Sequence, residues 1–223
     1  MGNKKIRKGT PARPRAQRRL RPLFVLIGVA AAAAALVYWQ RWSVRESERL
    51  ANNQLMLSEC EPGFAANVGQ VLRGLESRGV RPWIRESWRS PQDQERAFRS
   101  GRSEIRLGFH NVTGRNGEHR SFAVDIVERI DQTSTKPEYA VALSRLASAN
   151  GLQTGILWGL MDFERPAVER AIQNRSLPVD RYLKLGWDPC HLEPLNLSLA
   201  DALARVGASD RIVQPEPMAV TTR

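Results

Sequence analysis

The stretch Ser121-Phe122-Ala123-Val124-Asp125-Ile126-Val127-Glu128 decides the fold, because it is an apolar run typical of a core strand with a carboxylate in its middle. Burying Asp125 alone would carry a large desolvation cost, so a cation or several donors should meet it. A second stretch, Trp187-Asp188-Pro189-Cys190-His191-Leu192-Glu193, offers another carboxylate three residues before a histidine. Zinc hydrolases use such residues as metal ligands and as the base that deprotonates a water. Ordinary polar side chains in two separate strands remain an alternative interpretation.

Helical and strand patterns surround these stretches. Ser90-Pro91-Gln92-Asp93 combines an N-cap serine, a proline at the first helical position and an acid at the third. Arg89 therefore stands at a strand-to-helix corner, where its side chain can project into a cleft. Asn116-Gly117 predicts a type I′ hairpin turn. We expect helices over residues 64–79, 91–101, 139–150, 166–174 and 199–206, and strands over 81–88 and 121–128. The order of these elements along the chain indicates an α+β fold. Residues 152–180 show the weakest helix and strand patterns.

The basic charge lies in the N-terminal tail. The net charge is +11, and residues 1–21 hold nine of the 34 Lys and Arg and no acid. The remainder is nearly neutral, so we expect no nucleic-acid partner. Residues 23–39 carry no charge and end in aromatic residues, a pattern that favours one transmembrane helix with the tail in the cytoplasm. A cleaved signal peptide is the alternative, which nine preceding basic residues and bulky following ones disfavour.

Two cysteines, Cys60 and Cys190, follow this segment. An even pair in an exported domain predicts one disulfide, and the alternatives are a fourth zinc ligand or a free buried thiol. The expected order is a basic cytoplasmic tail over 1–21, a transmembrane signal anchor over 22–40, a stalk over 41–58, a folded domain over 59–208 and a disordered tail over 209–223. The domain would lie in the periplasm or cell-wall space, held to the inner (cytoplasmic) membrane as a monomer.

Taken together, these segments resemble the zinc D-Ala-D-Ala carboxypeptidases and L-alanyl-D-glutamate endopeptidases that cleave peptidoglycan. The resemblance covers about residues 60–195, and six pieces occur in the family's order. They are Ser87-Trp88-Arg89-Ser90, Gln94, Gly101-Arg102-Ser103, Gly108-Phe109-His110-Asn111, Ala123-Val124-Asp125-Ile126 and Asp188-Pro189-Cys190-His191. It implies a small antiparallel sheet flanked by helices, as in hedgehog and D-Ala-D-Ala peptidase folds.

One departure from the family concerns the first histidine, which usually lies seven positions before the aspartate. His119 lies six before Asp125 and His110 lies fifteen before it. An insertion over 112–119 that carries the hairpin would restore the family's spacing for His110. Choosing His119 would require a deletion inside a strand, which turns side chains to the other face. We therefore take His110 as the ligand and keep His119 as the alternative. A second departure is Gly108, where the family has serine.

The resemblance implies a site and an activity. His110, Asp125 and His191 would hold Zn²⁺, Asp188 would be the general base and Arg89 would stabilise the oxyanion. Ser90 and Gln94 would bind the substrate, a peptidoglycan stem peptide cut at L-Ala-D-Glu or D-Ala-D-Ala. Such a membrane-anchored metallopeptidase would serve wall remodelling or phage-type lysis. The alternatives are a catalytically inactive, membrane-tethered peptidoglycan-binding relative and a binder of anionic lipid or nucleic acid that uses the basic tail.

Overall fold

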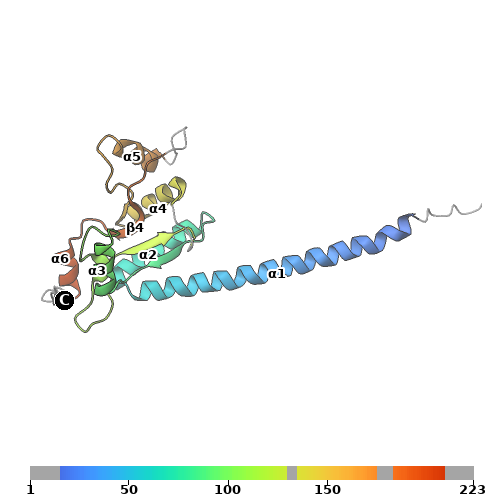
Figure 1. The fold of residues 1–223 in the computed structure, drawn as a ribbon, viewed down its shortest axis with the longest axis horizontal. Coiled ribbons are helices and arrows are strands. Elements are labelled where there is room, and N and C mark those ends of the chain that lie inside the picture. Colours follow the sequence, from blue (N-terminus) through green and yellow to red (C-terminus); the bar gives the residue numbers. More distant parts are fainter. Residues whose placement is uncertain (1–15, 130–134, 175–182, 209–223) are drawn as a thin grey trace, which may run out of the picture. The chain divides into compact units, whose positions relative to one another are not determined.

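The computed structural model describes residues 16–129, 135–174 and 183–208, with side chains from Ile27 onward. The expected tail over 209–223 and most of that over 1–21 lie outside the described residues. The chain divides into two units, Met1–Glu48 and Arg49–Arg223. The first holds most of α1 (Ala16–Ser58), the blue and cyan helix of Figure 1. No helix among the described residues is both long and apolar enough for a bilayer crossing. The side chains of residues 22–26 of the expected anchor over 22–40 lie outside those described.

The second unit is built on an antiparallel sheet of four strands, which confirms the α+β prediction. The strands are β1 (Trp83–Glu86), β2 (Val124–Val127), β3 (Leu152–Gly155) and β4 (Asp188–Pro194). Their spatial order is β1-β2-β4-β3, with all neighbours antiparallel. The two strands that carry the site residues are therefore at the centre of the sheet. Every residue of β2 is buried, as its apolar sequence predicts.

The expected helices form close to their predicted bounds. They are α2 (Pro62–Glu76), α3 (Pro91–Arg99), α4 (Pro137–Ala149), α5 (Arg165–Asn174) and α6 (Leu199–Arg205). The apolar residues of α2 at helical spacing are the buried ones, namely Phe64, Val68, Val71, Leu72 and Leu75. In Figure 1, α4 packs against β3 and β4 and also contacts α2 and α5. Helix α4 therefore joins the sheet to α2 and α5.

The last turns of α1 belong to the folded domain, so the expected boundary at residue 59 is wrong. Arg49 is 1% exposed, donates to the carbonyl of Pro82 at 3.0 Å and pairs with Glu76 at 2.8 Å. Asn53 accepts from the amide of Ile84 at 2.8 Å and donates to Pro82 at 2.9 Å. These side chains satisfy the backbone of residues 82–84 at the start of β1. The stalk expected over 41–58 is therefore in part an element of the domain.

We expect Arg49→Ala to lower the free energy of unfolding by about 3 to 5 kcal/mol, because it removes a buried side chain, breaks the ion pair with Glu76 and takes away one of the two donors to the Pro82 carbonyl. Urea unfolding of the full chain, followed by circular dichroism, measures this. Arg45→Ala, on the same helix but in the other unit, is the control and should change stability by less than about 0.5 kcal/mol. Equal unfolding free energies for the two variants would show that residues 49–58 do not stabilise the folded domain.

The hairpin between His110 and Asp125 forms, but with a different turn. The amide of Gly117 donates to the carbonyl of Gly114 at 3.0 Å, and Thr113 bridges His119 across the loop. Gly117 has φ +88°, whereas Asn116 does not take a positive φ, so the type I′ assignment is wrong. The glycine at the end of the turn supplies the left-handed residue instead.

The predicted disulfide is absent, because both cysteines are free and buried. The thiol of Cys60 donates to the carbonyl of Met56 at 3.4 Å, at the end of α1. Cys190 on β4 shares a hydrogen bond of 2.8 Å with the hydroxyl of Thr135, just before α4. Each sulfur therefore has a different set of neighbours. Of the three alternatives for these residues, the structure shows the free buried thiol.

Candidate metal centre

The register of the sheet and one short helix bring the candidate ligands together. Asp125 on β2 pairs directly with His191 on β4. His110 lies on a 3₁₀ turn, η1 (Phe109–Asn111), whose backbone is bound to both neighbouring segments. The amide of Arg89 donates to the His110 carbonyl at 2.9 Å, and that of Phe122 donates to Phe109 at 3.0 Å. A turn that follows a long loop is thereby fixed beside the sheet.

The three ligand atoms lie close enough to hold one ion. All lie within 4.8 Å of one another, and the residues are 7%, 4% and 7% exposed for His110, Asp125 and His191. Nδ1 of His191 is 3.3 Å from Oδ1 of Asp125, and Nε2 of His110 is 3.6 Å from the same oxygen. Two imidazoles and one carboxylate are the donors of many catalytic zinc sites. This buried group could hold a metal ion.

Outer hydrogen bonds orient each imidazole. Nδ1 of His110 donates to the Ser87 carbonyl at 2.5 Å, which directs Nε2 at the centre. Nε2 of His191 lies 3.2 Å from Oε2 of Glu193, which leaves Nδ1 as its inward atom. Gln153 on β3 donates to the other oxygen of Glu193 at 2.8 Å. Such partners fix the tautomer and direction of metal-binding histidines.

Arg85 supports the carboxylate ligand. Its guanidinium donates to Oδ2 of Asp125 at 3.2 Å, whereas the histidines approach Oδ1. A β-bulge lies between Ile84 and Glu86, where the β1 register against β2 shifts. Bulges redirect side chains of the strand that contains them. Arg85 therefore occupies one oxygen of Asp125 and leaves the other directed at the two histidines.

The electrostatics match a cation site. Burial raises the pKa of Asp125, but hydrogen bonds from His110 and His191 outweigh it and hold that pKa well below the ordinary value. Burial lowers the pKa of His191, but hydrogen bonds to Asp125 and Glu193 raise it to about 10. Without a metal ion, His191 is thus protonated at neutral pH. A bound metal must displace this proton, so metal affinity falls as the pH falls.

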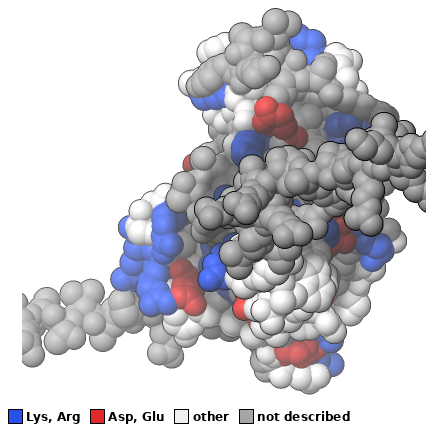
Figure 2. Space-filling view, turned by 90° about the vertical axis from the view of Figure 1, so that its right-hand side faces the viewer, with Lys and Arg blue, Asp and Glu red and all other residues white. Residues whose placement is uncertain are grey.

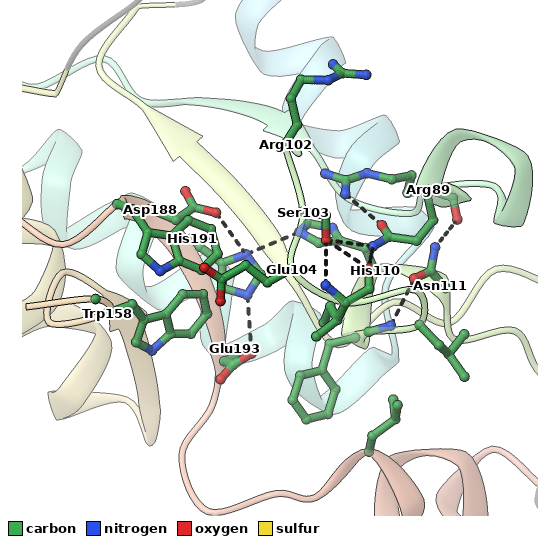
Figure 3. A pocket seen from close by; sticks show the side chains of 18 of the residues that line it. Arg89, Arg102, Ser103, Glu104, His110, Asn111, Trp158, Asp188, His191 and Glu193 are labelled. Carbon is green, nitrogen blue, oxygen red and sulfur yellow. Dashed lines mark hydrogen bonds and ion pairs between the residues drawn. The ribbon is translucent and has the colours of Figure 1, made fainter. Parts of the chain in front are cut away.

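Asp188 has the position and acidity of a proton acceptor. Oδ2 lies 3.9 Å from Nδ1 of His191, and the side chain lines the pocket. Burial and the charge of Asp125 raise its pKa to about 6, despite the lowering effect of His191, Arg85 and His110. In Figure 3, Asp188 lies beside His191 without being part of the three-ligand group. A carboxylate with this acidity is suited to move protons near neutral pH.

A pocket of about 590 Å³ opens over this group. Besides His110, Asp188 and His191, its walls include aromatic, basic and polar side chains, among them Arg89, Gln94, Arg102, Ser103, Glu104, Phe109, Trp158, Arg165, Trp187 and Glu193. In the view of Figure 3, Trp158 and Asp188 flank His191, and Arg89 lies across the pocket beyond His110. The candidate metal centre is therefore accessible from one concave surface.

Arg89 lines the pocket and is held firmly. Its Nε and NH2 donate to the two oxygens of Glu86, and NH1 donates to Oε1 of Gln94 at 2.7 Å. A guanidinium has five N–H groups, so two remain for a ligand. The amide nitrogen of Gln94 is occupied by Ser103 and Ile105 at 2.9 and 2.6 Å. Gln94 thus joins Arg89 to the pocket rim.

Ser90 and His119 lie outside the pocket wall. The Ser90 hydroxyl accepts from the amide of Asp93 at 3.1 Å and caps α3 as predicted. His119 stacks on Trp88 with ring centroids 3.6 Å apart and lies 3.4 Å from Glu59. Of the two candidate histidines, the structure brings His110 to Asp125, and His119 lies on the hairpin that follows His110.

Three supporting residues were not identified from sequence. Arg85 could have been predicted, because a basic residue in a strand can pair with a buried aspartate on the neighbouring strand. Gln153 lies on β3, which the sequence did not reveal, and Trp158 lies in the loop that follows it. Their roles depend on pairing across the sheet and cannot be read from local patterns.

We expect Glu193→Ala to weaken metal binding by about 10- to 100-fold, because His191 loses the acceptor that orients it. Competition with a chromogenic chelator measures the dissociation constant directly. Glu104→Ala is the matched control, since Glu104 also lines the pocket but is exposed and outside the ligand group. Equal affinities for these two variants would remove Glu193 from the metal centre.

No family model, curated protein or solved structure matches the chain.

Proposed function

We propose that the protein is a zinc metallopeptidase that hydrolyses peptidoglycan stem peptides. One observation carries the peptidase chemistry: ligand atoms of His110, Asp125 and His191 lie within 4.8 Å of one another, and both histidines line a pocket that Asp188 also lines. The ligand set is the one expected for a catalytic zinc ion with an open position. The substrate class rests on the sequence resemblance to peptidoglycan peptidases.

The pocket residues divide the chemical work. Zinc in such a site supplies a Lewis acid and lowers the pKa of water towards ~7. Asp188 accepts the proton of the attacking water and returns it to the amine that leaves. Arg89 donates its two remaining N–H groups to the carbonyl oxygen as negative charge develops there. Glu86 and Gln94 hold that guanidinium in place during the reaction.

We further propose that residues 22–40 anchor the enzyme in the inner membrane, with the domain on the outer side. Several apolar side chains of α1 are solvent-exposed, including Ile27 (57%), Val29 (62%), Leu36 (60%) and Trp39 (61%). A row of exposed apolar residues calls for an apolar partner, and lipid meets this need. The domain would then face its substrate in the periplasm or wall space, in wall remodelling or phage-type lysis.

A catalytically inactive, wall-binding relative is the second candidate. Its specific support is that Glu86 and Gln94 occupy three N–H groups of Arg89, and that Gly108 stands where the related family has serine. This candidate predicts zinc binding and retention on peptidoglycan without hydrolysis.

Incubating the full chain with purified peptidoglycan, with and without chelator, tests both candidates. Mass spectrometry of the soluble products identifies the new amine end and so the bond cleaved, L-Ala-D-Glu or D-Ala-D-Ala. Chelator-sensitive release of peptides supports the enzyme. Zinc-loaded protein that pellets with the wall and releases nothing supports the inactive relative.

A further inference from the structure

One wall of the pocket is an indole placed directly against a candidate ligand. The ring centroids of Trp158 and His191 are 4.9 Å apart at 46°, and both residues line the pocket. Trp187 lies beside Trp158 at 5.3 Å and is 52% exposed. In Figure 3, Trp158, Asp188 and Glu193 all lie next to His191, with Trp158 and Asp188 flanking its ring. The indole therefore borders the space in which a peptide bond would meet Asp188.

Two glycines allow the loop of Trp158 to reach this position. A Cβ on Gly186 would lie 2.4 Å from the Gly155 carbonyl and 2.6 Å from the Trp158 amide. A Cβ on Gly155 would lie 2.3 Å from the Asp188 carbonyl. Backbone cannot yield at such distances, so this approach requires glycine at both positions.

Hydrogen bonds then hold the two segments together. The amide of Gly186 donates to Ile156 at 2.6 Å, that of Trp187 to Trp158 at 3.1 Å, and that of Trp158 to Gly155 at 3.1 Å. Gly159, at φ +70°, turns the chain away immediately afterwards. Trp158 is thus presented by a backbone fixed on both sides. Its place beside His191 is a built feature of the fold.

The indole keeps an unused donor. Within the part of the chain that the structure describes, no acceptor is bonded to the Trp158 ring N–H. Trp side chains combine a large apolar surface with this single donor and usually find a partner for it. A peptide in the pocket offers carbonyl oxygens for the N–H and small side chains for the ring face. The Trp158 ring thus offers a ligand contact that is separate from the candidate metal ligands.

We propose that Trp158 is a specificity-determining residue that binds the peptide substrate beside the cleaved bond, through its ring face and its indole N–H. The inference rests on the proposed function, because it takes a peptide as the ligand. The segment after β3, which the sequence pattern did not explain, would then recognise the substrate. Trp187 would extend the same pocket wall towards solvent.

Binding and turnover of a synthetic stem peptide by the full chain test the proposal. Trp158→Phe keeps the ring and removes the N–H, so we expect KM to rise roughly 2- to 10-fold with kcat unchanged. Trp158→Ala should raise KM further. Trp88→Phe is the matched control, because Trp88 stacks on His119 outside the pocket, and its KM should equal that of the wild type.

Fluorescence supplies a readout without turnover. Co²⁺ bound by the candidate ligands should quench the nearest indole most strongly, and Trp158→Phe should remove more of the quenching than Trp88→Phe. Equal losses would overturn the placement of Trp158. Peptide affinity measured by calorimetry in an Asp188→Asn background separates the remaining outcomes. If the protein with Trp158 intact binds no stem peptide, the proposed function fails; if it binds and Trp158→Phe binds equally well, only this inference fails.

Discussion

Replacing His110 by alanine should abolish metal-dependent hydrolysis and weaken zinc binding by more than about 100-fold. The expected loss exceeds the 10- to 100-fold typical of an outer hydrogen-bond partner, because a ligand itself is removed. Asp125 would also lose one of the hydrogen bonds that offset its burial. Zinc content after dialysis and peptide release from peptidoglycan measure the two effects.

His119→Ala is the control for this prediction. The His119 side chain is 39% exposed, stacks on Trp88 and faces Glu59, so its removal should leave zinc and activity nearly intact. The pair of variants also tests the interpretation that residues 112–119 are an insertion. Loss of zinc in His119→Ala, with retention in His110→Ala, would show that interpretation to be wrong.

Asp188→Asn should retain zinc and lose most of the turnover, with kcat lower by about 10²- to 10⁴-fold. Asp188 lies outside the three-ligand group, and an amide cannot accept the water proton. The residual rate should also lose the pH dependence that Asp188 produces. In the wild type, the acceptor is ionised above its pKa of about 6, so activity should fall as the pH drops through that value.

Glu104→Gln is the control for Asp188→Asn, because it neutralises another pocket carboxylate that makes no hydrogen bond or ion pair with His191 in the described structure. It should keep kcat within a few-fold of the wild type. Near-normal hydrolysis by Asp188→Asn would remove this residue from the mechanism. Loss of zinc in Asp188→Asn would instead make it a ligand.

Much of the fold could be predicted because local signals and tertiary packing agree. The apolar spacing of α2 predicts its buried face, and the cap at Ser90 predicts where α3 begins. The candidate site residues could be predicted for a similar reason. Asp125 in an apolar strand requires a partner, and few residue types can supply one.

Other features depend on contacts that leave no local pattern. β3 spans only Leu152–Gly155, and it is followed by a loop whose course requires Gly155 and Gly186 to meet. A glycine in isolation does not reveal which distant backbone approaches it. Polar residues usually lie in solvent, so the polar sequence around Arg49 predicts a stalk. In the structure, Arg49 and Asn53 instead form hydrogen bonds with the backbone at the start of β1.

The two free, buried cysteines have a consequence for where the protein can mature. Burial, with the charges of Glu59 and Glu61, raises the pKa of the Cys60 thiol to about 12, so the reactive thiolate is scarce at neutral pH. Folding then needs no oxidant, and reducing agents should leave the folded chain unchanged. The same fold can form in a reducing cytosol and in an oxidising periplasm. For the proposed peptidase, export and not oxidation would then decide when it acts on the wall.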